Sequence, residues 1–329
     1  MVFFIVVLRA LAAILITNSH YTGVYPTDII ANGGLVGDII FFAVSGYCLF
    51  NVKGNFFSWY GKRILRIYPV IIIATLAYVL LGQYSLKEKS FVWWFVYPTN
   101  YHFVASILIL YIPFYFVMKF KVLKDKMPLI MLITLAVYLV IYVFFYDKSY
   151  YHIDTVREPM IRFLYFESML LGAYFHKNDQ KFRNKFNLIF GVIGTAVTFV
   201  AYFASKLAFS KYQSLAPFQL INQFLIFALL YCVFRLFISI DNKLENMPKP
   251  IKCIFEFLAK ITLEIYVVQN VLIKLLKPHF SFPINWIVIT ASIIISAYAL
   301  HLLSSLIIKG INMALLKFSK KQSKVKNEG

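Results

Sequence analysis

Apolar side chains fill this chain in long runs that are separated by short polar connections. As a helix, each run of about 20 residues is long enough to cross roughly 30 Å of hydrocarbon. The strict alternation of polar and apolar positions that a membrane β-barrel requires is absent from the sequence. The pattern therefore predicts an all-α fold, a polytopic integral membrane bundle of about 10 transmembrane helices. The expected spans are 2–19, 35–51, 64–82, 102–118, 127–146, 159–176, 188–206, 217–239, 253–273 and 284–308.

Composition agrees with this class of protein. Of the 329 residues, 61% are hydrophobic, 19% aromatic and only 14% charged, an apolar content above that of a soluble domain. The aromatic stretch at 91–98 is too short to span and is typical of the membrane interface. Cys48, Cys232 and Cys253 lack metal-ligand spacing, so we expect packing residues and no metal site.

The basic residues predict the orientation of the helices. The net charge is +19, and about two thirds of the 33 lysines and arginines fall in alternate connections and at the C-terminal end. The positive-inside rule then places both termini in the cytoplasm, with the basic connections against lipid headgroups. Nucleic-acid binding is not expected, because no recognition fold surrounds these patches. We expect a membrane domain over 1–309 and a basic cytoplasmic tail over 310–329 with a disordered end.

Two ionisable residues stand in or beside the first apolar run, where charge is costly and usually functional. Arg9 and His20 are eleven residues apart, so a continuous helix would place them on one face, about 16 Å apart along the axis. Under the expected orientation, Arg9 lies in the inner half of the span and His20 at its outer end. The pair predicts an anion-binding cation below a group that can move protons.

Polar residues of the second and third runs suggest further parts of a site. Arg63 and Arg66 lie three residues apart at the cytoplasmic mouth of the third span, where paired guanidiniums suit phosphate or carboxylate groups. Ordinary positive-inside anchoring also explains them. Asp38 and Ser45 share a face of the second span, and Asp38 lies at about the depth of His20. Asp38 either orients the imidazole or caps the start of its helix.

The ninth run carries two sets of polar residues. The residues of the first set recur at helical spacing and form a polar stripe. This polar stripe consists of Thr262, Tyr266 and Gln269. Glu256, Lys260 and Glu264 form an i, i+4 ladder whose charges would neutralise one another, and we interpret the ladder as structural. His301 stands alone in the tenth run and is expected to be a hydrogen-bonded packing residue.

Four segments of the chain carry a resemblance to a known family. They are LRALAAILITNSH, GDIIFFAVSGYCLF, GKRILRIYP and ITLEIYVVQ. In order and spacing they resemble the integral-membrane acyltransferase-3 family, and the resemblance covers almost the whole chain. Most members are bacterial O-acyltransferases that modify surface polysaccharides and related glycans. The resemblance implies transfer of an acyl group, most simply acetyl, from cytoplasmic acyl-CoA to an extracytoplasmic glycan or lipid-linked sugar.

The resemblance also implies roles for individual residues. Arg9 and His20 match a pair in which the histidine is regarded as the catalytic base. Arg63 and Arg66 match a pair that is associated with the acyl-CoA donor. On this basis Arg63 and Arg66 would hold the phosphates of CoA, and Arg9 would guide the pantetheine arm or the acyl carbonyl.

The remaining matches concern the second helix and the substrate. Asp38 and Ser45 match the acidic residue and the serine of the second-helix motif, implying a catalytic and a donor-binding role. The polar stripe matches a motif that often ends in histidine, which Gln269 replaces here. His102 stands in a region that usually carries a tryptophan. The polar stripe and His102 are therefore the expected substrate-binding residues.

The implied chemistry has two possible courses, and two other functions stay open. His20 would take the proton of a sugar hydroxyl, after which the alkoxide attacks the thioester directly or His20 carries the acyl group transiently. A transporter or flippase would instead use buried Arg9 and His20 to move an anion or a proton without consuming thioester. A polysaccharide polymerase is a third reading, which the absence of a long extracytoplasmic loop disfavours.

Overall fold

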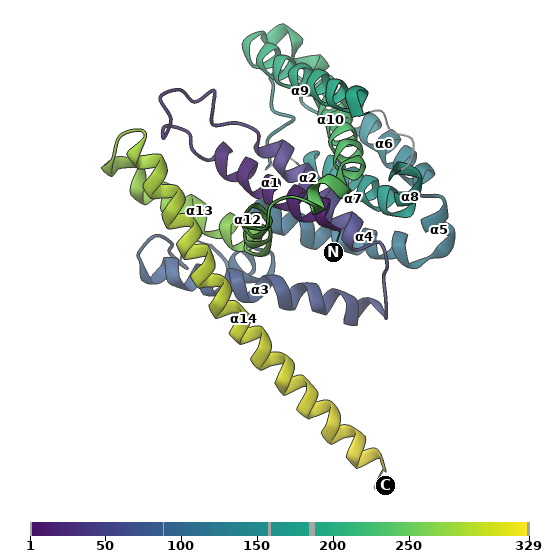
Figure 1. Ribbon diagram of the computed structural model, residues 1–329, viewed down its shortest axis with the longest axis vertical. Coiled ribbons are helices and arrows are strands. Elements are labelled where there is room, and N and C mark those ends of the chain that lie inside the picture. Colours follow the sequence, from purple (N-terminus) through teal and green to yellow (C-terminus); the bar gives the residue numbers. More distant parts are fainter. Residues whose placement is uncertain (1, 88, 157–158, 184–187, 328–329) are drawn as a thin grey trace. The chain divides into compact units, whose positions relative to one another are not determined.

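The structure is a computed structural model that describes residues 2–87, 89–156, 159–183 and 188–327, with side chains as far as Leu315 (Figure 1). Within these residues every regular element is a helix, which confirms the all-α prediction. The longer helices are α1 (Phe3–Ser19), α2 (Gly34–Cys48), α3 (Phe56–Leu80), α4 (His102–Lys119), α6 (Met127–Phe144), α7 (Ile161–Lys177), α9 (Leu188–Lys211), α10 (Leu220–Ser239), α12 (Lys249–Lys260), α13 (Thr262–Leu276) and α14 (Ile284–Asn327). The short segments are η1 (Val92–Val96), α5 (Lys121–Asp125), α8 (Asp179–Arg183), η2 (Gln213–Phe218), α11 (Asp241–Glu245) and η3 (Lys277–His279).

Length and composition identify the helices that can cross a membrane. Among the described residues six helices qualify, namely α3, α4, α6, α9, α10 and the Ile284–Leu315 part of α14. The helices α1 and α2 are apolar but shorter. Every expected span except the ninth overlaps one of the longer helices and no other. A multi-pass membrane protein is thus confirmed, whereas the number of about 10 crossings stays a prediction.

The chain divides into two compact units. The first unit comprises Met1–Ser19, Asn32–Phe56 and His102–Lys260, and the second comprises His20–Ala31, Phe57–Tyr101 and Ile261–Gly329. The division falls within the first motif, since Arg9 belongs to the first unit and His20 opens the second.

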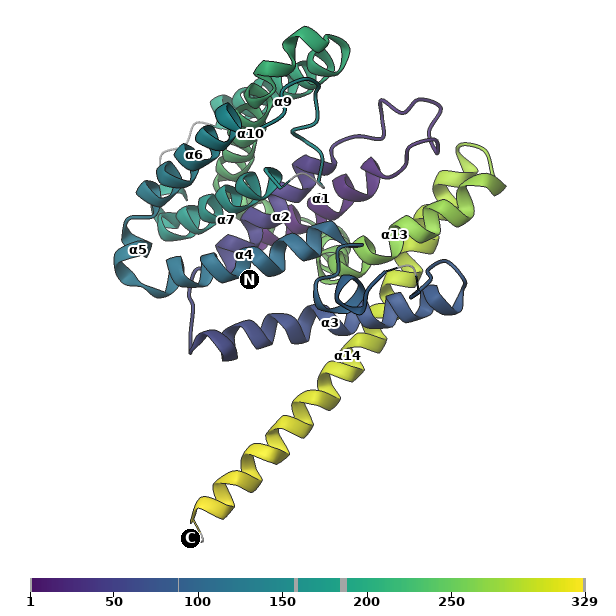
Figure 2. The same ribbon diagram turned by 180° about the vertical axis from the view of Figure 1, so that it is seen from behind.

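The core of the first unit is built around α2, which packs on α1 and on α7 (Figure 2). The contact with α7 is close because two glycines face backbone atoms. A Cβ atom on Gly46 would overlap the carbonyl group of Met169, and one on Gly172 would overlap the carbonyl group of Ala43. Missing side chains allow membrane helices to approach closely. Gly46 and Gly172 therefore allow the close approach of α2 and α7.

A buried polar cluster anchors the connection between α6 and α7. Asp154 accepts hydrogen bonds from the Tyr151 hydroxyl at 2.6 Å, from Asn222 Nδ2 at 2.5 Å and from Gln223 Nε2 at 2.7 Å. Burial raises the pKa of the Asp154 carboxyl group, and the Tyr151 and Gln223 hydrogen bonds oppose that rise. Because Asn222 and Gln223 lie on α10, the cluster fastens this connection to the paired helices α9 and α10.

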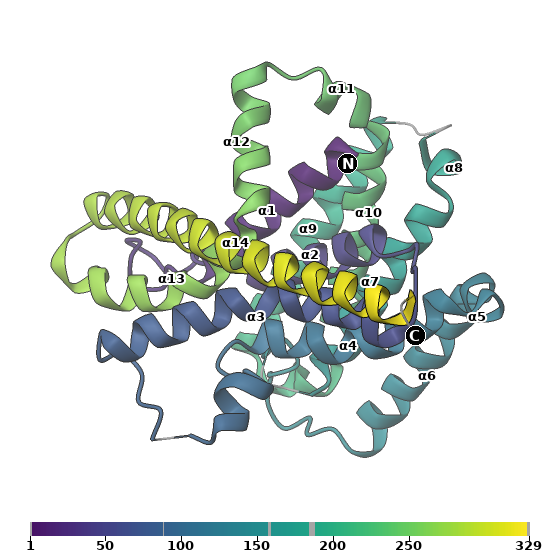
Figure 3. The same ribbon diagram turned by 90° about the horizontal axis from the view of Figure 1, so that it is seen from below.

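In the second unit, α13 and α14 form an antiparallel helical hairpin (Figure 3). The helix α3 contacts α13 through the Tyr78 hydroxyl, which donates to the carbonyl oxygen of Val267 at 3.5 Å. The segment that follows His20 is held against α14, where the Tyr21 hydroxyl and Thr290 Oγ1 lie 2.8 Å apart. This unit therefore joins the connection after α1 to the C-terminal hairpin.

The ninth expected span is wrong as a single element. It divides at Ile261 into α12, which ends the first unit, and α13, which belongs to the second. The sequence of α12 has four charged residues in twelve positions, which is costly in hydrocarbon, so the expected apolar span does not extend through α12. The Glu264 end of the charged ladder is also wrong, whereas Glu256 and Lys260 keep their i, i+4 spacing on α12. Glu264 lies on a different helix from Glu256 and Lys260, and it binds His301.

The C-terminal segment also differs from the expectation of a disordered end. The helix α14 continues to Asn327. No glycine or proline occurs between Gly310 and Asn327, and the leucine, alanine and lysine residues of this segment are good helix formers. Local propensity therefore extends the last membrane helix into the basic tail.

Candidate active site

The helix α1 carries Arg9 and ends immediately before His20. Arg9 is a half-buried cation in the second turn, and its Nη2 atom lies 4.0 Å from the sulfur of Cys48 on α2. The helix ends at Ser19, whose hydroxyl donates to the carbonyl oxygen of Ile16 at 2.7 Å. Burial lowers the pKa of the His20 imidazole. A lowered pKa keeps this ring neutral and able to accept a proton near neutral pH.

Asp38 is a buried residue of α2, with 5% of its surface exposed. Its carboxyl group accepts a hydrogen bond from the Tyr165 hydroxyl of α7 at 2.9 Å, and the Tyr165 ring stacks on Phe42 at 4.2 Å. The helix α2 starts at an N-cap, Gly33, without a side-chain cap, so the alternative in which Asp38 caps this helix is wrong. Ser45 is half-buried two turns further along α2.

Arg63 and Arg66 both lie in the first half of α3, which begins earlier than the sequence predicted. The Arg63 guanidinium lies over the Trp59 ring, 4.3 Å from its centroid, and Nη1 donates to the Trp59 carbonyl oxygen at 3.0 Å. Arg66 is exposed, three residues further on. Spacing of three residues puts the two guanidiniums on neighbouring positions of one helix face. Such a pair suits the phosphate groups of a nucleotide.

The polar stripe lies on a single helix, α13, as the spacing predicted. Thr262 and Gln269 are buried, and Tyr266 is half-buried. Near the start of the same helix, the carboxyl group of Glu264 forms a hydrogen bond with Nδ1 of His301 on α14, at 2.8 Å. The expected hydrogen-bonded packing role of His301 is confirmed, and its partner is a carboxyl group that the sequence had assigned to another pair.

The two compact units each hold part of the expected site. Arg9, Asp38 and Ser45 belong to the first unit together with His102, the half-buried first residue of α4. The remaining expected residues belong to the second unit. These are His20, Arg63, Arg66, Thr262, Tyr266 and Gln269.

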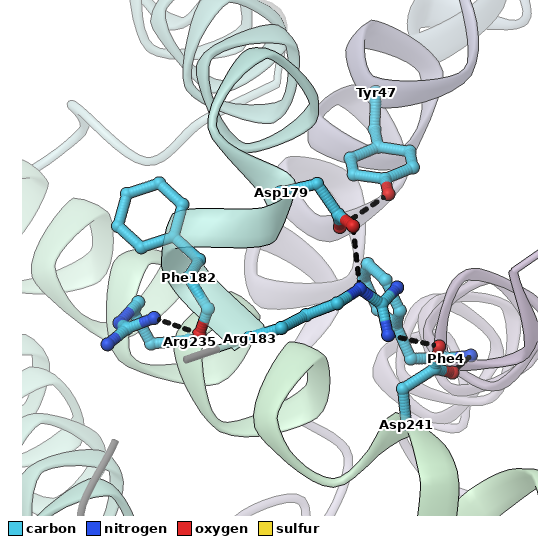
Figure 4. A network of polar contacts seen from close by, with 7 residues as sticks. All are labelled: Phe4, Tyr47, Asp179, Phe182, Arg183, Arg235 and Asp241. Carbon is cyan, nitrogen blue, oxygen red and sulfur yellow. Dashed lines mark hydrogen bonds and ion pairs between the residues drawn. The ribbon is translucent and has the colours of Figure 1, made fainter. Parts of the chain in front are cut away.

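One ionic network of the first unit was not recognised in the sequence (Figure 4). The Arg183 guanidinium donates from Nε to Asp179 at 2.6 Å and from Nη1 to Asp241 at 2.8 Å. The Asp179 carboxylate also accepts the Tyr47 hydroxyl at 2.9 Å, and Asp241 accepts the backbone N–H of Phe4 at 2.7 Å. The i, i+4 spacing of Asp179 and Arg183 was a signal for the first pair. Asp241 and Phe4 are too distant along the chain to be found in this way.

No group of three or more histidine, cysteine, aspartate or glutamate residues that could hold a metal ion occurs in the described part of the chain. The polar groups of the candidate site are three guanidiniums, three hydroxyls, two imidazoles, one amide and one carboxyl group. A family model described as an acyltransferase domain, acyltransferase-3, matches residues 2–308. The chain belongs to this family.

Comparisons with curated proteins and with solved structures found no match. The family match confirms the resemblance that four short motifs indicated. Together with the apolar helices, it makes the chain a multi-pass membrane acyltransferase. An acyltransferase requires an acyl donor and an acceptor, and the residues above are the candidates for binding them.

Proposed function

We propose that this acyltransferase moves an acyl group, most simply acetyl, from cytoplasmic acyl-CoA to a hydroxyl of an extracytoplasmic glycan. The proposed acceptor is a capsule, exopolysaccharide or O-antigen glycan, either as a polymer or as a lipid-linked sugar. The observation that carries the proposal is the family match over residues 2–308 combined with Arg9 in α1 and His20 directly after it. An acyltransferase assignment favours consumption of a thioester over the transport alternative.

The donor binds on the cytoplasmic side in this proposal. Arg63 and Arg66 bind the phosphates of CoA, because two neighbouring guanidiniums provide several fixed N–H donors for phosphate oxygens. Trp59 holds the Arg63 guanidinium through its ring and its carbonyl oxygen, and so reduces the conformational entropy lost on binding. Ser45 and Arg9 lie along the path of the pantetheine arm toward the reacting carbonyl.

His20 is the general base of the proposed reaction. Its neutral imidazole takes the proton of the sugar hydroxyl, the oxygen forms a bond to the thioester carbon, and the carbon–sulfur bond breaks. The CoA thiolate leaves and is protonated by water, and His20 returns its proton to water outside. In the alternative course His20 first accepts the acyl group and then transfers it. Asp38 stabilises the imidazolium in either course, and Tyr165 fixes the Asp38 carboxyl group.

The acceptor and the acyl group contact the polar stripe and His102. The hydroxyls of Thr262 and Tyr266 and the amide of Gln269 are the kinds of donor and acceptor that recognise sugar hydroxyls. Both termini are cytoplasmic and the protein resides in the plasma or inner membrane, as the basic connections indicate. The membrane domain then covers 1–309, and 310–329 is a basic cytoplasmic tail.

Mass spectrometry of surface glycans tests the proposal. Cells that lack the gene, or that carry His20→Ala or Arg63→Ala, should lose an ester substituent with the mass of one acyl group. His279→Ala and Lys62→Ala are matched controls, because both side chains are exposed and belong to no proposed site. These controls should retain the ester. Unchanged acylation in His20→Ala cells would overturn the mechanism, and a glycan changed only in amount or chain length would indicate export or polymerisation.

A further inference from the structure

A single guanidinium links the start of α1 to the end of α2 (Figure 4). Arg183 lies at the last position of the short helix α8 and donates to two carboxylates, Asp179 and Asp241. Asp241 also accepts a hydrogen bond from the N–H of Phe4 on α1. Asp179 also accepts a hydrogen bond from the hydroxyl of Tyr47 on α2. We call these five residues the Arg183 clamp.

In the clamp, each of the four carboxylate oxygens of Asp179 and Asp241 accepts a hydrogen bond. The Asp241 side chain is only 3% exposed, and its two oxygens accept from Phe4 and from Arg183. The Phe4 N–H belongs to the first turn of α1, where backbone donors have no partner within the helix. A guanidinium is suited to this task because its planar fork holds two carboxylates in fixed directions, which a lysine ammonium does not do.

The two helices that the clamp joins both carry residues of the proposed donor path. Arg9 follows Phe4 by five residues, about 7.5 Å along α1. Ser45 precedes Tyr47 by two residues on α2. The clamp therefore adds fixed polar contacts to the direct packing of α1 on α2, at the start of α1 and the end of α2.

We propose that Arg183 is a positioning residue for the acyl donor, which acts by fixing Arg9 on α1 relative to Ser45 on α2. This inference rests on the proposed function. Arg183 does not bind the donor directly, because two carboxylates already neutralise its charge and direct its donors. A fixed Arg9 meets the donor in one geometry, and a misplacement of about 1 Å is enough to weaken such an interaction strongly.

The test measures binding of CoA itself to the full-length chain in detergent micelles, by calorimetry, so that no acceptor is needed. Arg183→Lys keeps the charge and loses the fork, and it should weaken CoA binding about tenfold. Arg235→Lys is the matched control. Arg235 holds the same helix α8 against α10 through the carbonyl oxygen of Phe182, at 2.5 Å. This control should bind CoA as the unaltered chain does.

A double-mutant cycle distinguishes positioning from a general loss of structure. Arg9→Lys should also weaken CoA binding, and the Arg9→Lys, Arg183→Lys double variant should bind about as weakly as Arg9→Lys alone. A merely structural effect of Arg183 would lower the unfolding temperature and multiply with the effect of Arg9→Lys. Tyr47→Phe leaves both ion pairs intact and removes only the link to α2. It should weaken CoA binding by about twofold to threefold, and it replaces Arg183→Lys if that variant does not fold.

Three further results would each contradict either the positioning role of Arg183 or the proposed donor. Unchanged CoA binding in Arg183→Lys and in Tyr47→Phe would overturn the positioning role while leaving the proposed donor intact. Fully multiplicative effects in the cycle would do the same. An unaltered chain that does not bind CoA would overturn the proposed donor, and the positioning inference with it.

Discussion

Two buried tyrosines of the first unit differ in what their hydroxyls contact. The Tyr165 hydroxyl donates to Asp38, whereas the buried hydroxyl of Tyr138 has no hydrogen-bond partner among the described residues. Tyr165→Phe should therefore lower the free energy of unfolding by about 1–3 kcal/mol, because a buried carboxyl group loses its donor. Tyr138→Phe removes a hydroxyl that makes no such bond and should be close to neutral. Thermal unfolding in micelles compares the two, and equal unfolding temperatures would contradict the assigned role of Tyr165.

At the scale of residues, the sequence identified groups more reliably than partners. Arg9, Arg63 and Arg66 could be recognised because charge in or beside an apolar run is costly and therefore conspicuous. The partner of Glu264 could not be read in the same way. Its neighbour by helical spacing was Lys260, and the actual partner, His301, comes from another helix. Contacts between helices depend on packing, and spacing along one helix does not determine them.

The contact between α2 and α7 leaves no room for a methyl group on either of its two glycines. Gly46→Ala and Gly172→Ala would each place a Cβ atom against a backbone carbonyl of the facing helix, so the two backbones must move apart. Each change should cost about 1–3 kcal/mol of unfolding free energy. Gly61→Ala on α3 is the control, because nothing lies within 4 Å of the added atom. It should be neutral or stabilising in the same thermal assay. An unchanged unfolding temperature in Gly46→Ala would show that this close contact does not form.

At the scale of elements, long apolar runs could be predicted and interruptions could not. The helices α4 and α6 begin where the sequence placed their spans. The break at Ile261 was missed because the residues from 253 onward are mostly apolar, and the hydropathy of the run concealed the charged residues before and within α12. The contact of Gly46 and Gly172 depends on which helix packs against α2, which spacing along one helix does not indicate. Periodicity predicts faces of helices, and pairing of faces is a property of the folded unit.

At the scale of the whole chain, several basic residues of the first unit lie close to the segment that follows α2. Lys119 and Lys124 donate to carbonyl oxygens of the segment that follows α2, and Lys177 pairs with Asp125 at 2.9 Å. The Arg183 clamp lies at the ends of α2 and α10. These residues come from separate connections that the charge pattern had assigned to one side. Their common location within the unit supports the cytoplasmic orientation that we propose, since the positive-inside rule concerns residues close to the helix ends.

The proposed orientation predicts opposite accessibility for two sites of the first unit. Ser149, in the connection between α6 and α7, and Cys253, on α12, are both exposed, and the helices α7, α9 and α10 lie between them in the chain. If each of these three helices crosses the membrane, the two sites lie on opposite sides of it. A membrane-impermeant maleimide should label Ser149→Cys in a cysteine-free variant of intact cells. It should label Cys253, in a variant where Cys48 and Cys232 are serine, only after the membrane is permeabilised. Labelling of both sites in intact cells would mean that one of the three helices does not cross, and the reversed pattern would place the basic connections outside.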